Sequence, residues 1–229
     1  MLEYTKVPGF SDSVAVLYQG SSNPNLQVNS KFNNSINDYG RGLYLTPSYT
    51  KAFEWAFSKY NKNPDVSYTY TYYINLEGLK VLDLSNLRPA IWVAVLMSNR
   101  PVDSHFAEFD YRCSKLKELI SFDVSEYDVI YGYRADDSYY TYATEFVSGM
   151  LTEETLGVAM SLGKLGAQYC VKSDRAFNNL HLVKRDKLDK RIYGGKFNKV
   201  DRDARNEFAR LRNIGNTFIT NIVGGSNGS

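Results

Sequence analysis

Two adjacent carboxylates, Asp136 and Asp137, follow the short apolar segment YDVIYGY, which runs from Tyr127 to Tyr133. An apolar run of this length is typical of a buried strand, so both side chains are expected where that strand ends. Carboxylates at a strand end suit contact with a ligand or an acceptor. They suit equally well the cap of a following helix, because aspartate is a favoured N-cap residue. The residues alone leave both roles open.

Conventional catalytic motifs are missing from the chain. The Gly40-Arg41-Gly42 segment is not a dinucleotide fingerprint, and no GxxxxGK[ST] phosphate loop, HExxH motif or serine-nucleophile motif occurs. With two cysteines, Cys113 and Cys170, and two histidines, the chain offers neither a disulfide framework nor the ligands of a zinc cage. We therefore expect no bound metal, and the sequence does not support a conventional hydrolase or kinase.

Two short motifs carry the strongest signal: LYQGS, from Leu17 to Ser21, and DYGRGLYLTPSYTKAFEWA, from Asp38 to Ala56. They resemble the nicotinamide-binding part of the ADP-ribosyltransferase fold, which poly(ADP-ribose) polymerases and diphtheria-type toxins share. In that superfamily the first strand ends in a His-Gly pair. A second strand reads Gly-basic-Gly-aliphatic-Tyr and is followed by a helix. The segment from Gly40 to Tyr44 matches the second pattern without a break.

The chain is still more similar to a bacterial and phage domain family of unknown function with this fold. Its further motifs occur here in the same order, from Tyr127 to Asp137, from Thr152 to Glu154 and from Gln168 to Phe177. The resemblance extends from about Val14 to Val183. It implies an α+β domain with an ADP-ribosyltransferase-like split β-sheet core and flanking helices.

The resemblance also implies that the protein uses NAD as a substrate and breaks its nicotinamide–ribose bond. The backbone of Gly20 would hold the carboxamide, and Tyr44 and Trp55 would stack on the nicotinamide ring. A cationic ring between two aromatic faces gains about 1–2 kcal/mol. Without the resemblance, both aromatics are equally well explained as core residues. The other candidate NAD-binding residues are Gln19, Ser21, Arg41 and Gly42.

Two positions depart from the superfamily pattern. Gln19 replaces the histidine that binds the adenosine ribose in the polymerases, and Gln168 stands where the superfamily has its catalytic glutamate. A glutamine can offer a carbonyl dipole to an oxocarbenium ion, but it cannot act as a base. The candidate catalytic residues are therefore Gln168, Asp136, Asp137 and Tyr44, with one of the aspartates expected to supply the missing carboxylate.

The leading hypothesis is a mono-ADP-ribosyltransferase that modifies a macromolecular acceptor, as a toxin, an effector or a phage or defence factor. The alternative is a catalytically inactive NAD-binding or protein-interaction module, as the two glutamines suggest. The acceptor is a protein or a nucleic acid. The sequence names neither.

The hydrophobic periodicity predicts the elements that position these residues. Strands are expected at 14–18, 42–46, 67–74, 79–84, 127–133, 168–172 and 181–183. Helices are expected at 47–60, 89–97, 106–120, 138–147, 153–162 and 201–213. Thr46 is the expected N-cap of the first helix, with Pro47 in its first position, and Thr152 is the expected N-cap of the helix at 153–162.

The charge distribution divides the chain. The whole sequence has a net charge of +2, whereas the segment from Lys184 onward has 11 Lys and Arg against 5 Asp and Glu. We therefore expect a body over residues 1–183 and a basic extension over 184–229 with one helix and a flexible end. Such an extension suits either solubility or contact with a nucleic acid. Without a signal-peptide pattern or a long apolar segment, a cytoplasmic location without membrane contact is expected.

Overall fold

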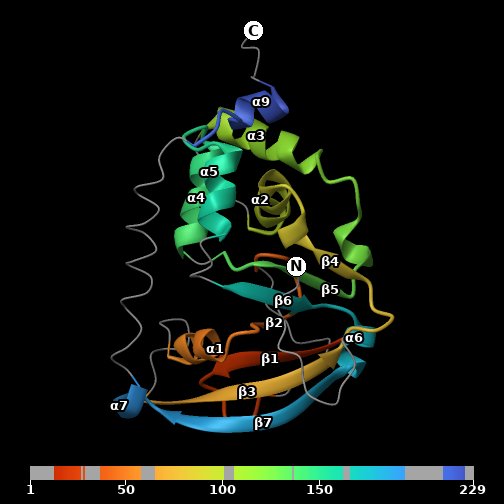
Figure 1. The fold of residues 1–229 in the computed structure, drawn as a ribbon, viewed down its shortest axis with the longest axis vertical. Coiled ribbons are helices and arrows are strands. Elements are labelled where there is room, and N and C mark those ends of the chain that lie inside the picture. Colours follow the sequence, from red (N-terminus) through yellow and green to blue (C-terminus); the bar gives the residue numbers. More distant parts are fainter. Residues whose placement is uncertain are drawn as a thin grey trace.

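The computed structural model describes residues 13–26, 28, 37–57, 65–100, 106–135, 137–161, 166–193 and 214–224. It is a mixed α+β structure in which two β-sheets lie one above the other and a layer of helices covers the second sheet (Figure 1). The α+β class expected from the sequence is confirmed.

The first sheet, called sheet A here, contains β1 (Val14–Ser21), β3 (Val66–Asn75) and β7 (Leu180–Asp189) in the order β1-β3-β7. Both pairings are antiparallel. The alternation of β3 explains its two faces. Tyr70, Tyr72 and Ile74 point into a core shared with the second sheet, whereas Ser67 and Thr69 bind atoms of α1 (Tyr49–Ala56) on the other face.

The second sheet, sheet B, has the order β2-β6-β5-β4 and consists of β2 (Leu43–Leu45), β6 (Ala167–Val171), β5 (Val129–Tyr133) and β4 (Val81–Asp83). Its pairs are antiparallel except β4 with β5, which is parallel. Every residue of β6 is buried, as its apolar sequence predicts for a strand covered on both faces. A bridge between Tyr18 and Thr46 links the edges of the two sheets.

The helical layer packs on sheet B. It contains α2 (Pro89–Asn99), α3 (Ala107–Lys117), α4 (Asp137–Val147), α5 (Glu153–Ser161) and the short α9 (Ile219–Val223). Helix α2 is apolar around its whole circumference and is buried from Ala90 to Met97, apart from the half-buried Ile91. The short elements η2 (Leu84–Asn86), η3 (Val124–Glu126), α6 (Asp174–Asn178) and α7 (Lys190–Tyr193) complete the described structure.

The start of α1 differs from the expectation. Ser48, not Thr46, is the N-cap, and its hydroxyl accepts the amide proton of Lys51 at 3.3 Å. Thr46 remains extended because its N–H and C=O both bind the backbone of Tyr18, at 2.9 and 2.8 Å. Because Thr46 pairs across the two sheets, the helix begins only after Ser48, and Pro47 lies before the N-cap. The Thr152 cap of α5 is confirmed, since its hydroxyl accepts the N–H of Thr155 at 3.2 Å.

The expected boundary between residues 183 and 184 falls inside β7, which pairs with β3 as far as Asp189. Beyond it, Ile219 of α9 is fully buried in the core of the helical layer, and Phe218 forms a bridge with Thr152. These pairings correct the boundary: residues 184–189 and 214–224 belong to the packed body. The helix expected at 201–213 and the chain end after residue 224 lie outside the described residues.

Candidate functional site

The end of β1 has an open backbone edge at Gly20. In an antiparallel ladder, the N–H and C=O of successive residues point to opposite edges of the strand. Tyr18 uses both groups to bind Thr46 of the neighbouring sheet, so those of Gly20, two residues later, point the same way, away from β3. Beyond Thr46 the chain leaves for α1. Among the described residues, no hydrogen bond to these two groups of Gly20 is found on that edge.

The missing side chain of Gly20 faces α1. A Cβ at this position would lie 1.9 Å from the backbone oxygen of Ala52 and 2.5 Å from the backbone nitrogen of Ala56. The nearest atoms to that Cβ all belong to the backbone of α1. The glycine is required because the helix backbone itself occupies that space.

Trp55 lies beside this contact on α1, half-buried, on the flank of the face formed by Ala52 and Ala56. The guanidinium carbon of Arg134 lies 4.8 Å from the centre of a Trp55 ring, in cation–π contact. Arg134 directly follows β5, and its N–H binds the carbonyl of Gly166 at 3.2 Å. The end of β5, the start of β6 and α1 therefore meet at the Trp55 indole, which already holds one planar cation.

Tyr44 lies on the opposite face of sheet B from the core that the two sheets share. Its ring packs against Tyr39, with the ring centres 6.3 Å apart. Its hydroxyl donates to the carbonyl of Gly40 and accepts the N–H of Tyr39, both at 2.8 Å. Burial raises the pKa of Tyr44 far above its ordinary value, so the hydroxyl stays protonated. Both hydrogen bonds of the Tyr44 hydroxyl are therefore made to the backbone of the loop before β2. This geometry does not bring Tyr44 together with Gly20 and Trp55.

Two further residues of that loop, Arg41 and Gly42, differ in their surroundings: the first is exposed and the second is packed. Arg41 has an exposed side chain, and its carbonyl accepts a weak hydrogen bond from the Cys170 thiol at 3.7 Å. A Cβ on Gly42 would lie 2.5 Å from the Cys170 sulfur and 2.7 Å from the carbonyl oxygen of Val171. Gly42 thus lets β2 approach β6, while Arg41 is free to reach a ligand.

Gln168 lies in a buried polar network with a residue that the sequence analysis did not select, Asp38. The Nε2 of Gln168 donates to Asp38 Oδ2 at 2.6 Å. The same oxygen accepts the N–H of Ala135 at 3.0 Å, and Arg100 binds Oδ1 at 2.9 Å. Arg100 also donates to the Ala135 carbonyl at 2.7 Å, and its guanidinium lies 4.3 Å from the centre of the Tyr140 ring.

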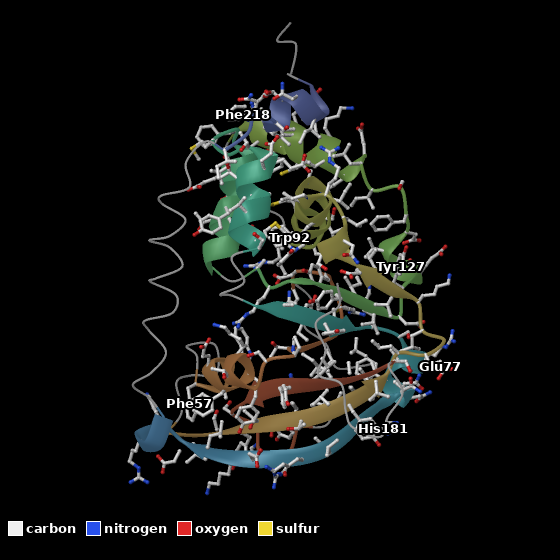
Figure 2. All side chains as sticks on the ribbon, in the orientation of Figure 1. Phe57, Glu77, Trp92, Tyr127, His181 and Phe218 are labelled. Atoms are coloured by element: carbon white, nitrogen blue, oxygen red, sulfur yellow. The ribbon has the colours of Figure 1, made fainter. Side chains whose placement is uncertain are left out.

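The network continues to Trp92 of α2, which Figure 2 labels within the helical layer. The Nε1 of Trp92 donates to the hydroxyl of Tyr39 at 2.9 Å, and that hydroxyl donates to the carbonyl of Tyr133. Gly132 makes room for it, because a Cβ there would lie 2.5 Å from the Tyr39 oxygen. Burial raises the pKa of Tyr39 well above its usual range, so the phenol keeps its donor proton.

Two polar atoms in sheet A lack hydrogen-bond partners among the described residues: Oε1 of Gln19 and the hydroxyl of Tyr72, both buried. The residues lie on adjacent strands, and both alternate towards the core between the sheets. The neighbouring Tyr70 is satisfied, since its hydroxyl donates to the carbonyl of Asn23 at 2.6 Å. Ser21 shapes the same loop, because its hydroxyl accepts the N–H of Asn23 at 3.1 Å.

The two aspartates proposed from the sequence are not tested. Asp136 lies outside the described residues, and Asp137 opens α4 with a side chain that is not described. The carboxylate that the structure does bring to Gln168 is Asp38. Its position as the first residue of the DYGRGLYLT motif was the available signal, but no local pattern reveals a partner 130 residues away.

A protein-family model described as "Protein of unknown function (DUF3990)" matches residues 15–182. The chain belongs to this family. The match spans both motifs, β1 to β6 and part of β7, and it agrees with the expected resemblance to a family of unknown function. No curated protein and no solved structure matches the chain.

Neither a membrane-spanning helix nor a metal-binding group of side chains occurs in the described part of the chain. None of its helices is long and apolar enough to cross a membrane. The same residues contain no group of three or more His, Cys, Asp or Glu side chains that could hold a metal ion.

Proposed function

We propose that this protein is an NAD-dependent mono-ADP-ribosyltransferase whose nicotinamide site is the Gly20 edge beside Trp55. The observation that carries the proposal is the open backbone edge of Gly20, where both polar groups of one residue point away from β3. An adjacent N–H and C=O form one donor and one acceptor, which complement the C=O and NH₂ of a carboxamide. The split between the sheets at the Tyr18–Thr46 bridge supports the ADP-ribosyltransferase-like arrangement.

Trp55 supplies the second element of such a site. A pyridinium ring on the indole would gain cation–π energy, and the guanidinium of Arg134 on that ring supports the use of this surface by a planar cation. Two cations cannot share one indole face. The nicotinamide therefore either displaces Arg134 or uses the other face.

The reaction would break the bond between the ribose C1′ and the nicotinamide nitrogen. The bonding electrons leave with nicotinamide, which departs as a neutral molecule, and the positive charge develops on the ribose. A nucleophilic atom of a protein or nucleic-acid acceptor then forms the new bond to C1′ and loses its proton. The exposed Arg41 remains our candidate for the NAD phosphates, and Gln19 for a ribose hydroxyl.

A catalytically inactive NAD-binding module is the second candidate. The observation that favours it is the neutral amide of Gln168, whose buried carboxylate neighbour has both oxygens engaged in hydrogen bonds. Binding would then occur without turnover. In either case, the basic residues of β7 offer a surface that a nucleic acid could contact.

Isothermal titration calorimetry with NAD up to millimolar concentration tests the proposal. Trp55→Ala should abolish binding, whereas Tyr73→Ala, an aromatic truncation on β3 beside His181, should leave it unchanged. Arg134→Gln should bind NAD at least as tightly as the wild type, because it removes the competing cation. Wild-type protein that binds neither NAD nor nicotinamide would exclude both candidates. Binding without release of nicotinamide, with protein and RNA acceptors present, would select the inactive module.

A further inference from the structure

The strongest unexplained feature of the molecule is the direct contact between the Asp38 carboxylate and the Gln168 carboxamide. Both side chains are buried, with residues 8% and 6% exposed, and the two atoms lie 2.6 Å apart. They come from the loop before β2 and from β6, so only the tertiary fold joins them. Arg100 of α2 and the N–H of Ala135 complete the hydrogen bonds of the carboxylate.

This contact fixes the orientation of the Gln168 amide. An ionised carboxylate can only accept hydrogen bonds, so the NH₂ end of the amide must face Asp38. The Nε2 also lies 3.5 Å from the carbonyl of Tyr133, a second acceptor on the same side. The carbonyl end is therefore turned away from both.

The same contact determines which side chain is stable at residue 168. A glutamate here would place two carboxylates at hydrogen-bonding distance inside the protein, where they cannot both be ionised at moderate cost. The environment therefore requires a donor at residue 168 as long as Asp38 is present. Gln168 thus supplies the donor that Asp38 requires. The single change Gln168→Glu, to the residue type of the superfamily, would disrupt the pair.

We propose that Asp38 is the positioning residue for Gln168: it fixes the orientation of the Gln168 amide and polarises its carbonyl through the Nε2 hydrogen bond. This assignment rests on the proposed function for its catalytic meaning, because Gln168 is the group expected beside the ribose. Hydrogen bonds to an ionised group are the stronger kind, and a bond at one end of an amide increases the negative charge at the other. Arg100 in turn holds Asp38 in place.

The proposal implies that the carboxylate of residue 38 and the carboxamide of residue 168 can be exchanged for each other. Asp38→Asn leaves Arg100 without its carboxylate, and Gln168→Glu adds an unmatched negative charge. The double variant Asp38→Asn/Gln168→Glu restores one carboxylate, one carboxamide and one guanidinium in the same space. It also moves the carboxylate to the position where the superfamily has its glutamate.

The pH dependence of the variants is simple because the neighbouring groups do not titrate. Arg100 is the cation that faces the pair, and Tyr39, Tyr44, Tyr140 and Cys170 are the other ionisable neighbours. Burial is the largest cause that raises the pKa of each of these four, to about 12 for Cys170, so they stay neutral between pH 4 and 8. The pH dependence of the variants is therefore expected to come from the glutamate introduced at residue 168.

The first test measures the melting temperatures of the wild type, both single variants and the double variant between pH 4 and 8. Gln168→Glu should melt roughly 10 °C below the wild type at pH 7.5, because two buried carboxylates are close. The neighbouring charge raises the folded-state pKa of the new glutamate above its unfolded value of about 4.3. Its contribution is thus fully present below that pH and is lost as the pH rises through the folded-state pKa. The double variant should recover at least half of the summed losses.

The second test detects the Asp38–Gln168 hydrogen bond and needs no activity measurement. The side-chain amide protons of ¹⁵N-labelled Gln168 should resonate downfield in the wild type and move upfield in Asp38→Asn. If turnover is found, Asp38→Asn should lower kcat at least tenfold with less than a twofold change in the affinity for NAD, since Asp38 is buried behind Gln168.

Two results would overturn the assignment: a Gln168→Glu variant as stable as the wild type at pH 7.5, or strictly additive losses in the double variant. A wild type that does not bind NAD removes the catalytic meaning alone. The melting temperatures and the amide resonances still decide whether Asp38 positions Gln168.

Discussion

Sheets A and B differ in whether their buried polar groups have hydrogen-bond partners among the described residues. On sheet B, the Asp38 network satisfies the buried carboxylate, and Tyr39 and Trp92 bind each other and the carbonyl of Tyr133. In sheet A, Gln19 Oε1 and the Tyr72 hydroxyl lack described partners, and the edge of Gly20 is open. Unpaired buried polar atoms cost stability, and they are retained where they have another use. The comparison favours our proposal of the Gly20 edge in sheet A as the binding site, with the satisfied network of sheet B fixing the orientation of Gln168.

Truncation after Val183 should have the largest effect. It removes the half of β7 that pairs with β3 from Lys184 to Asp189, including the buried Leu188, and the buried Ile219 of α9. Sheet A would then end in an unpaired β3 edge, so we expect no cooperative unfolding transition by circular dichroism. Truncation after Gly224 is the control and should melt like the wild type. A truncated protein ending at Val183 that folds and binds NAD would restore the boundary expected from the sequence.

Gly20→Ala and Gly132→Ala compare the two sheets at matched positions. The Cβ at Gly20 would collide with helix backbone at 1.9 Å, whereas at Gly132 it would meet a side-chain oxygen of Tyr39 at 2.5 Å. Backbone yields less than a side chain, so Gly20→Ala should cost about 3 kcal/mol and Gly132→Ala about 1–2 kcal/mol. Urea denaturation measures both, and the reverse order would contradict the close α1 packing.

Tyrosine-to-phenylalanine variants test the difference in hydrogen bonding directly. Tyr39→Phe removes the acceptor of Trp92 Nε1 and should destabilise the fold by about 1–3 kcal/mol. Tyr72→Phe deletes a buried hydroxyl without a described partner, so its free energy of unfolding should equal or exceed that of the wild type. Should the Tyr72 hydroxyl serve a ligand, the same variant will weaken NAD binding in calorimetry.

Asp128 gives a small expected effect with a pH signature at the start of β5 in sheet B. Burial opposes its ionisation, but the Ser173 hydroxyl and the N–H of Lys80 outweigh it and hold the pKa of Asp128 below its ordinary value. A lowered folded-state pKa contributes stability that is present above the unfolded value of about 3.9 and is lost as the pH falls through the folded value. Asp128→Asn should cost about 1 kcal/mol at pH 7, and the difference should disappear near pH 2. A difference that persists in acid would assign the loss to packing.

The sequence by itself determined the elements and the family. Period-2 alternation in β3, the apolar runs of β5 and β6 and the Thr152 cap are local features, and local features decide where strands and helices form. The motifs from Leu17 to Ala56, together with those that follow in the same order as far as Phe177, predicted a resemblance to a family of unknown function, which the match over residues 15–182 bears out.

Only the tertiary structure decided which polar groups meet and which remain unpaired. The Asp38–Gln168 bond joins residues 130 positions apart, and the start of α1 moved to Ser48 because Thr46 pairs with Tyr18 across the two sheets. The need for a glycine at position 20 is likewise a tertiary effect, since the atoms nearest its absent Cβ belong to a helix more than 30 residues later. Hydrogen bonds and steric contacts act over a few ångströms in space, and a chain pattern records distance only along the sequence.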